Sequence, residues 1–241
     1  MSECSLSKWR DGGYLLDVST LGLGTLTELD FDAVIFDMDG TLIDSTPAVV
    51  RAWTTWAIEH GVTAEQLAGH HGMPSAGVIR KLLPEHRHET AIDRINELEL
   101  DDVHDIVVLP GAVEALAALA SVKSAIATSC TLPLAKARIA AAELVPPSVL
   151  VTADQVAHGK PAPDPFLLAT ERLGVAPERC LVVEDAPAGL AAAQAAGCYR
   201  LAVVTTTPED ELQADGIVRN LGDVKFSVDE GGRITVRPVA F

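Results

Sequence analysis

The chain has 241 residues, of which 48% are hydrophobic and 4% aromatic, and its formal net charge is −16 at pH 7. This length suits one large domain or one core domain with a small insert, and the apolar share is ample for a core. The acidity argues against nucleic acid and anionic membranes as partners, and no apolar run reaches the roughly 18 residues of a membrane span.

Residues 1–29 show no regular period, because Gly12, Gly13, Gly22 and Gly24 interrupt them. We expect an N-terminal extension of unknown structure: a mobile arm, an addition to an edge strand or a misassigned start. It has no basic region followed by an apolar core, so a secretory signal is not expected. The four cysteines are scattered without C-x-x-C spacing. This pattern predicts free thiols in the reducing cytoplasm, without disulfides or a zinc site.

From residue 30 onward, apolar strands alternate with alanine-rich helices. The expected strands are Ala33–Phe36, Ala125–Thr128, Val149–Val151, Leu181–Val183 and Leu201–Val204. The expected helices are Val113–Leu119, Leu134–Ala142, Pro165–Leu173 and Ala188–Ala196, and the tail Lys225–Val236 reads as a hairpin. This alternation predicts an α/β core, a doubly wound parallel sheet formed by residues 30–44 and 109–241. In such sheets the site lies beyond the carboxyl ends of the strands.

The connection between the first two strands is about 70 residues long, which exceeds a simple loop. Apolar residues between positions 48 and 57 recur on one helical face, Gly61 follows this helix, and Thr63–Gln66 has a capping-box pattern. Further helical stretches are expected near 76–83 and 90–100. Residues 45–108 are therefore predicted to form a small all-helical cap domain with hinges at its two ends.

Two carboxylates, Asp37 and Asp39, follow the first strand and are followed by Gly40 and Thr41. Side chains two positions apart at a strand end point the same way. At about 4 Å two such charges repel by roughly 4 kcal/mol at an effective dielectric near 20, so the pair needs a cation or a shared proton. The alternative is a loop in which both residues cap turns and Gly40 takes a positive φ.

Asp37–Thr41 after an apolar strand resembles the first motif of the haloacid dehalogenase (HAD) superfamily of phosphohydrolases. Ile126–Ser129 looks like the second motif, Gly159–Pro161 like the third and Val182–Gly189 like the fourth. The resemblance implies a HAD-like core with a helical cap of the family's first type. Within the superfamily the chain is most similar to bacterial sugar phosphatases and glycerol-phosphate phosphatases, in the β-phosphoglucomutase-like subfamily.

The resemblance assigns the acidic residues to catalysis and metal binding. Asp37 would be the nucleophile that forms an aspartyl phosphate, and Asp39 the general acid and then the base. Asp37 and Asp185 would bind Mg²⁺ through their side chains, Asp39 through its backbone carbonyl, and Glu184 directly or through water. For Glu184 and Asp185 the alternative is an acidic pair favoured by a helix dipole.

The remaining candidate residues would bind the phosphate and the substrate. Lys160 would place a positive charge beside the phosphoryl group, and Thr128 and the backbone N–H of Ser129 would contact its oxygens. The alternatives are a solvated lysine and a strand-end hydroxyl. His71, in a cap loop expected to face the site, is a candidate for substrate contact. Cys130 stands where the family usually has Gly, so it is expected either at the phosphate pocket or in plain packing.

These residues predict a Mg²⁺-dependent phosphatase of small sugar or polyol phosphates, a monomer or weak homo-oligomer. Dehalogenases of the superfamily lack the second Asp of the first motif, which is Asp39 here. Phosphomutases of the β-phosphoglucomutase type, one alternative, grip a second phosphate with an arginine in a cap loop that here, at residues 72–76, has none. The other alternative, a non-catalytic sugar-phosphate-binding protein, has no need of Asp39.

Overall fold

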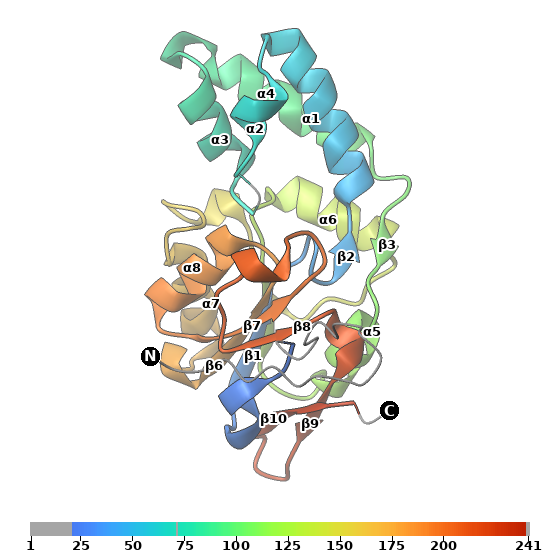
Figure 1. Ribbon diagram of the computed structural model, residues 1–241, viewed down its shortest axis with the longest axis vertical. Helices are drawn as coiled ribbons and strands as arrows, with labels where there is room; N and C mark the ends of the chain where they lie inside the picture. Colours follow the sequence, from blue (N-terminus) through green and yellow to red (C-terminus); the bar gives the residue numbers. More distant parts are fainter. Residues whose placement is uncertain (1–20, 71, 240–241) are drawn as a thin grey trace, which may run out of the picture.

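The computed structural model describes residues 21–70 and 72–239, and it places a group of helices on top of a helix-flanked sheet (Figure 1). The sheet has six strands in the order β5-β4-β1-β6-β7-β8, and every neighbouring pair is parallel. Their bounds are β1 Ala33–Phe36, β4 Ser124–Ala127, β5 Val149–Val151, β6 Cys180–Glu184, β7 Tyr199–Val203 and β8 Gly216–Val218. The predicted doubly wound parallel sheet is confirmed, and only β8 was not expected.

Alternate residues of the strands face opposite sides of this sheet. Val34 and Phe36 of β1 belong to one hydrophobic cluster, which α5 (Ala112–Ala118) and α6 (Leu132–Ala141) cover. Ala33 and Ile35 belong to the other, which is covered by α7 and α8. These two helices span Asp164–Leu173 and Pro187–Ala196. Burial on both faces explains why the strands read as continuous apolar runs.

Four α-helices between β1 and α5 pack around their own small core, and we call them the cap. They are α1 Thr46–His60, α2 Ala64–Leu67, α3 Ser75–Leu82 and α4 His88–Asp101. Trp56 lies fully buried at the centre, where its indole N–H donates to the carbonyl of Ala91 at 2.8 Å. Gly61 ends α1 in the left-handed conformation and Thr63 forms the expected capping box. Among the described helices, none has the length and apolar character that crossing a membrane requires.

Two short strands join the cap to the sheet. β2 (Ile43–Asp44) leads into the cap, β3 (Val107–Val108) leads out of it, and the two pair antiparallel. They lie at the two predicted hinges. The domain boundaries themselves stay a prediction.

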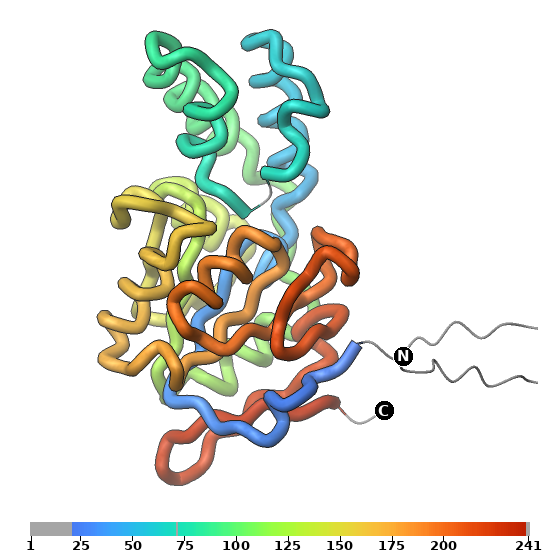
Figure 2. Tube along the Cα trace, turned by 60° about the vertical axis from the view of Figure 1, so that its left-hand side comes forward, coloured from blue at the N-terminus to red at the C-terminus, as the bar shows by residue number. Residues whose placement is uncertain are grey.

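The described part of the N-terminal extension lies against the edge of the sheet. Gly22 exchanges two backbone hydrogen bonds with Ile217 of β8, at 2.7 and 2.8 Å. Leu23 and Leu26 are buried in the core beside it. Figure 2 shows this segment along the base of the molecule, next to the C-terminal hairpin of β9 (Val224–Val228) and β10 (Ile234–Pro238). Residues 21–29 are therefore an addition to the sheet edge, whereas residues 1–20 lie outside the described residues.

Short 3₁₀ helices complete the connections between these elements. They span Gly24–Glu28, Glu85–Arg87, Ala153–Gln155, Pro177–Arg179, Glu209–Glu211 and Leu221–Asp223.

Candidate active site

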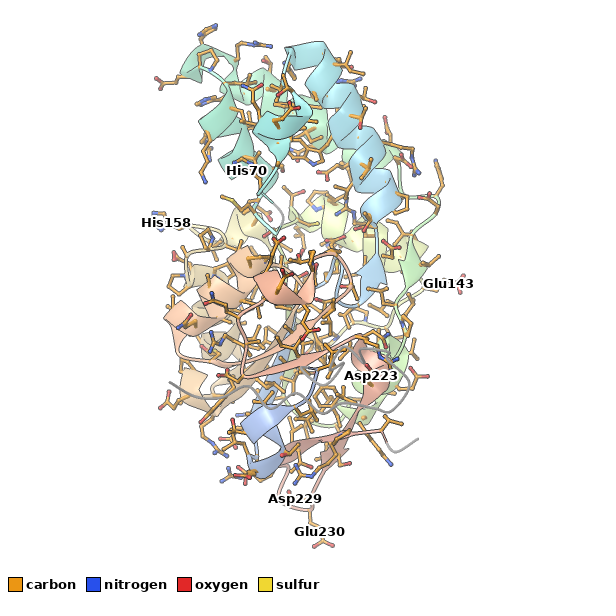
Figure 3. All side chains as sticks on the ribbon, in the orientation of Figure 1. His70, Glu143, His158, Asp223, Asp229 and Glu230 are labelled. Carbon is orange, nitrogen blue, oxygen red and sulfur yellow. The ribbon has the colours of Figure 1, made fainter. Side chains whose placement is uncertain are left out.

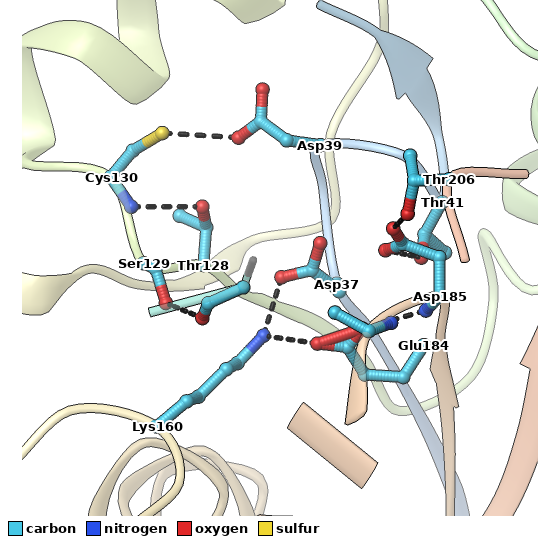
Figure 4. A network of polar contacts seen from close by, with 12 residues as sticks. Asp37, Asp39, Thr41, Thr128, Ser129, Cys130, Lys160, Glu184, Asp185 and Thr206 are labelled. Carbon is cyan, nitrogen blue, oxygen red and sulfur yellow. Dashed lines mark hydrogen bonds and ion pairs between the residues drawn. The ribbon is translucent and has the colours of Figure 1, made fainter. Parts of the chain in front are cut away.

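The sheet topology gathers the motif residues at one edge. Asp37 follows β1, Thr128 follows β4, and Asp185 follows β6, while Lys160 lies in the connection after β5. Because β4, β1 and β6 are adjacent and parallel, their carboxyl ends meet, and all four side chains converge there (Figure 4). This is the edge at which a doubly wound sheet places its ligands.

Lys160 is a buried cation between two carboxylates. Its Nζ lies 2.5 Å from Oδ1 of Asp37 and 3.0 Å from Oε1 of Glu184, and the residue is only 1% exposed. Burial lowers the pKa of Lys160, whereas the negative charges of Asp37 and Glu184 raise it. The charges have the larger effect, so the pKa of Lys160 lies above its ordinary value. The alternative of a solvated surface lysine is therefore wrong, and this position carries a fixed positive charge.

Asp185 adds a third buried carboxylate beside the two that contact Lys160. Oxygens of Asp37, Glu184 and Asp185 all lie within 4.8 Å of one another. Burial raises the pKa of Asp37 to about 8, against the opposing charge of Lys160, and burial together with the neighbouring Glu184 charge raises the pKa of Asp185 well above its usual range. The cluster thus has more negative groups than its lysine can neutralise, and oxygen ligands of this kind suit a hard divalent cation.

Glu184 is tied to the protein through both of its oxygens. Oε1 accepts from Lys160, and Oε2 accepts the backbone N–H groups of Asp185 at 2.7 Å and Ala186 at 3.2 Å. Gly189 of α8 leaves the space for this side chain, since a Cβ there would lie 1.6 Å from Oε1. Both oxygens of Glu184 are therefore engaged, and the residue holds Lys160 and the loop after β6.

The side chain of Asp39 has its own partners, separate from the carboxylate cluster. Its Oδ1 accepts from Ser45 Oγ at 2.6 Å and from Arg138 Nη1 at 2.9 Å, and its Oδ2 accepts from Cys130 Sγ at 3.0 Å. Figure 4 shows the carboxylate of Asp39 turned toward Cys130, while that of Asp37 faces Lys160. The two carboxylates after β1 therefore do not share one cation, and each has a different one.

Arg138 is one of the site residues that the sequence analysis missed, together with Ser45, Glu99 and Thr206. Arg138 lies on the face of α6 that also buries Leu134, Ala135 and Ile139. The sequence could have indicated it, because Arg138 is a charged residue on the apolar face of a helix, and such a residue is seldom buried without a partner.

The residues after β4 contact both the pocket and the cap. Thr128 is buried and its Oγ1 accepts the backbone N–H of Cys130 at 3.1 Å, which leaves its O–H to donate elsewhere. Ser129 Oγ donates to the carbonyl of Gly72 in the cap at 2.7 Å. Cys130 lies at the pocket and is also buried, and burial raises the pKa of its thiol well above the usual value. Cys130 therefore lines the pocket, and its contacts there with Asp39 and Arg138 go beyond plain packing. That this is the phosphate pocket stays a prediction.

A pocket of about 370 Å³ lies between these residues and the cap. Its cap side combines polar residues, among them Thr46, Thr54, Ser75 and Glu99, with the apolar residues Val49, Val50, Trp53, Ala64, Leu67, Met73 and Val78. Among the described lining residues, Arg138 is the sole lysine or arginine. His70 lies where the cap meets the sheet and lines the pocket (Figure 3), whereas the candidate His71 lies outside the described residues.

Comparisons with known proteins match most of the chain. The family model of haloacid dehalogenase-like hydrolases matches residues 31–197, a range that includes all four motifs. Hexitol phosphatase A of Escherichia coli (strain K12) is 39% identical over 210 residues, which cover 84% of this chain and 97% of that protein. Glycerol-1-phosphate phosphohydrolase 1 of Saccharomyces cerevisiae is 34% identical over 225 residues, covering 84% and 89%. The crystal structure of a hydrolase from Pseudomonas syringae matches with a TM-score of 0.73 and 27% identity, covering 80% and 95%.

Proposed function

The chain belongs to the haloacid dehalogenase-like hydrolase family, and on this premise we propose that it is a Mg²⁺-dependent phosphatase of small sugar or polyol phosphates. One observation carries the proposal: Asp37, paired with Lys160, lies among buried carboxylates at the floor of a pocket that the cap covers. A carboxylate in this position can attack phosphorus and split one difficult displacement into two easier ones.

In the first step Asp37 forms a bond to phosphorus while the bond to the leaving oxygen breaks, and Asp39 gives that oxygen a proton. In the second step Asp39 takes a proton from water, the water oxygen attacks phosphorus, and Asp37 is released with inorganic phosphate. The hydroxyl of Thr128, which lines the pocket, would hold a phosphoryl oxygen, and Lys160, held against Asp37, would place its positive charge beside the phosphoryl group, whose negative charge grows in the transition state. Ser129 would contribute its backbone N–H.

The carboxylates of Asp37 and Asp185 and the backbone carbonyl of Asp39 are the groups that would hold Mg²⁺. Bound there, the ion would neutralise phosphoryl charge next to the reacting centre. Thr41 and Thr206 donate to the two oxygens of Asp185 and so fix its orientation.

The pocket favours a monophosphate of a neutral alcohol. Its volume of about 370 Å³ lies in the usual range for small ligands. The described cap residues that line it contribute neither lysine nor arginine, so they offer no cation for a second phosphate. This observation favours hydrolysis over the phosphomutase alternative. The names of the relatives, a hexitol phosphatase and a glycerol-1-phosphate phosphohydrolase, support sugars and polyols as the leaving group.

The test is phosphate release from a panel of sugar, polyol and glycolytic phosphates, with Mg²⁺ and with EDTA. We expect metal-dependent release that is strongest for one sugar or polyol class. If no panel member releases phosphate, the phosphatase proposal is wrong, and isomerisation of sugar 1-phosphates with a bisphosphate activator becomes the next assay.

We also expect Mg²⁺ to stabilise the fold, and more so at pH 8 than at pH 5.5. In the metal-free protein the pKa of Asp37 is raised from 3.8 to about 8, so the folded state binds more protons than the unfolded state. The free energy of unfolding therefore falls as pH rises through this window. Mg²⁺ would take the place of the proton on Asp37, and it competes with fewer protons at pH 8 than at pH 5.5. At a concentration near 100 Kd it would add about 2.7 kcal/mol, or roughly 5–10 °C in Tm for a chain of this size.

Differential scanning calorimetry at both pH values, with and without Mg²⁺, measures this shift. Asp185→Asn is the matched variant, because it removes one expected ligand and keeps the shape of the side chain. A Tm increase that is equal in this variant, or that does not grow with pH, would contradict the assigned metal position.

A further inference from the structure

Arg138 connects the proposed acid/base residue to the cap. The residue is only 2% exposed, and its guanidinium donates from Nη1 to Oδ1 of Asp39 at 2.9 Å and from Nη2 to Oε1 of Glu99 at 3.2 Å. Asp39 belongs to the loop after β1, Arg138 to α6, and Glu99 to α4 of the cap. One buried guanidinium thus joins the sheet edge, a flanking helix and the cap.

Stability alone gives little reason for this arrangement. Taking an arginine and a carboxylate out of water costs free energy that their attraction only partly returns, and apolar residues of similar size often serve a core as well or better. Glu99 is 6% exposed, so its pair with Arg138 is removed from solvent on both sides. The Nε of Arg138 has no hydrogen-bond partner in the described part of the chain. The guanidinium therefore has three partners, the two carboxylates and Sγ of Cys130, which lies 3.1 Å from Nη1.

We propose that Arg138 is a positioning residue that holds the Asp39 carboxyl group at the pocket, and that Glu99 holds Arg138 in place from the cap. The inference rests on the proposed phosphatase function and deepens it. Asp39 also accepts from Ser45 and Cys130, but Arg138 is its charged donor. A charge-assisted hydrogen bond is stronger and better directed than a neutral one, so Arg138 is the contact that determines where the carboxyl group lies.

Glu99 has two effects on Arg138. Glu99 fixes the side of the guanidinium that faces away from Asp39. It also partly neutralises the positive charge of Arg138, so that Arg138 orients Asp39 while its charge is divided between two carboxylates. Because Glu99 belongs to the cap, the position of the cap influences how firmly Asp39 is held. This link gives the cap a part in the proton transfer beyond covering the pocket.

The leaving group provides a test that a merely structural role would not satisfy. An alkoxide needs a proton in order to leave, whereas p-nitrophenolate leaves without one, so a displaced acid harms the first reaction far more than the second. The comparison is kcat/KM for a sugar or polyol phosphate that the wild type accepts against kcat/KM for p-nitrophenyl phosphate. kcat/KM reports the step that forms the aspartyl phosphate, which precedes the shared hydrolysis of that intermediate.

Arg138→Met is expected to lower kcat/KM for the alkyl phosphate by about 100-fold, the lower end of the usual contribution of general acid catalysis. For p-nitrophenyl phosphate we expect a loss below about 10-fold. Asp39→Asn should show the same bias, and Arg138→Lys should recover part of it. An equal loss on both substrates, or no loss on either, would overturn the proposal.

Two further variants separate positioning from folding and test the cap's share. Arg138→Met combined with Glu99→Gln removes the charges of both residues, and it should keep the bias without leaving Glu99 as an unpaired buried carboxylate. Glu99→Gln alone should lower activity on the alkyl phosphate selectively, and wild-type behaviour in this variant would overturn the role of the cap. Arg94→Met is the control. Arg94 lies in α4, the helix of Glu99, and its partners Glu59 and Glu97 are at the surface.

The outcome does not depend on the substrate class proposed above. If the wild type accepts no sugar or polyol phosphate, phenyl phosphate replaces it, because phenol, like tyrosine, has a pKa of about 10 and is a poorer leaving group than p-nitrophenol. If the wild-type protein turns over no phosphate ester, a crystal structure of the Arg138→Met variant tests whether Arg138 positions Asp39. A displaced Asp39 carboxyl group supports the proposal, and an unmoved one that still contacts Ser45 and Cys130 overturns it.

Discussion

Replacement of Asp37 by Asn is expected to lower kcat for phosphate release by at least about 10⁴-fold, the scale seen when a catalytic nucleophile is removed. An amide oxygen carries no charge and cannot attack phosphorus to give a stable acyl phosphate. Lys160 and the hydroxyl of Thr128 would still bind the phosphoryl group, so substrate affinity should persist. The measurement is phosphate release with Mg²⁺, together with rapid acid quenching of a reaction with ³²P-labelled substrate. Labelled protein should appear with the wild type and be absent with Asp37→Asn.

The fold should survive this change. Lys160 keeps its contact with Glu184 at 3.0 Å, and the substitution removes one of the mutually repelling carboxylates of the cluster. Tm is therefore expected to stay within a few degrees of the wild type. Asp102→Asn is the control, since Asp102 pairs with Arg51 at the surface, away from the pocket lining. Retention of more than about 1% of wild-type activity by Asp37→Asn would exclude the nucleophile assignment, given the loss that removal of a nucleophile causes.

Replacement of Lys160 by Met is expected to harm both stability and catalysis. Asp37 and Glu184 would lose their ion pairs with Lys160. Breaking a buried ion pair typically costs about 3–5 kcal/mol. For a chain of this length that corresponds to a fall in Tm of roughly 6–20 °C. Loss of the charge beside the phosphoryl group should lower kcat by about 10²–10³-fold. Thermal unfolding without added metal and phosphate release with Mg²⁺ measure the two effects.

The loss of stability in Lys160→Met should shrink as the pH is lowered. Protonated carboxyl groups do not need a counter-ion, and burial already raises the pKa of Asp37 and Asp185. We therefore expect a larger difference in Tm at pH 8 than at pH 5. Lys136→Met is the control, because Lys136 is exposed on α6, and exposed substitutions usually change stability by less than about 0.5 kcal/mol. A difference in Tm that is independent of pH would contradict the carboxylate cluster as its cause.

Local patterns predicted most of the fold. The first strand was placed at Ala33–Phe36 as the structure has it, because a strand buried on both faces leaves an unbroken apolar run. Gly61 was recognised as the end of a helix, and it takes the left-handed conformation there. The short strand β8 was missed, since Gly216–Val218 is too brief to show a period and depends on its pairing with β7.

The sequence by itself determined which residues meet at the working edge of the sheet. Asp37, Thr128 and Asp185 each follow an apolar strand, and parallel pairing of those strands brings their carboxyl ends together whatever the details of packing. Only the tertiary structure decided which cation each carboxylate receives. Lys160 is 123 residues from Asp37, and Arg138 is 99 residues from Asp39. Such pairings depend on how helices and loops pack across the sheet, and local periodicity cannot rank them because it records only which face of its own element a residue occupies.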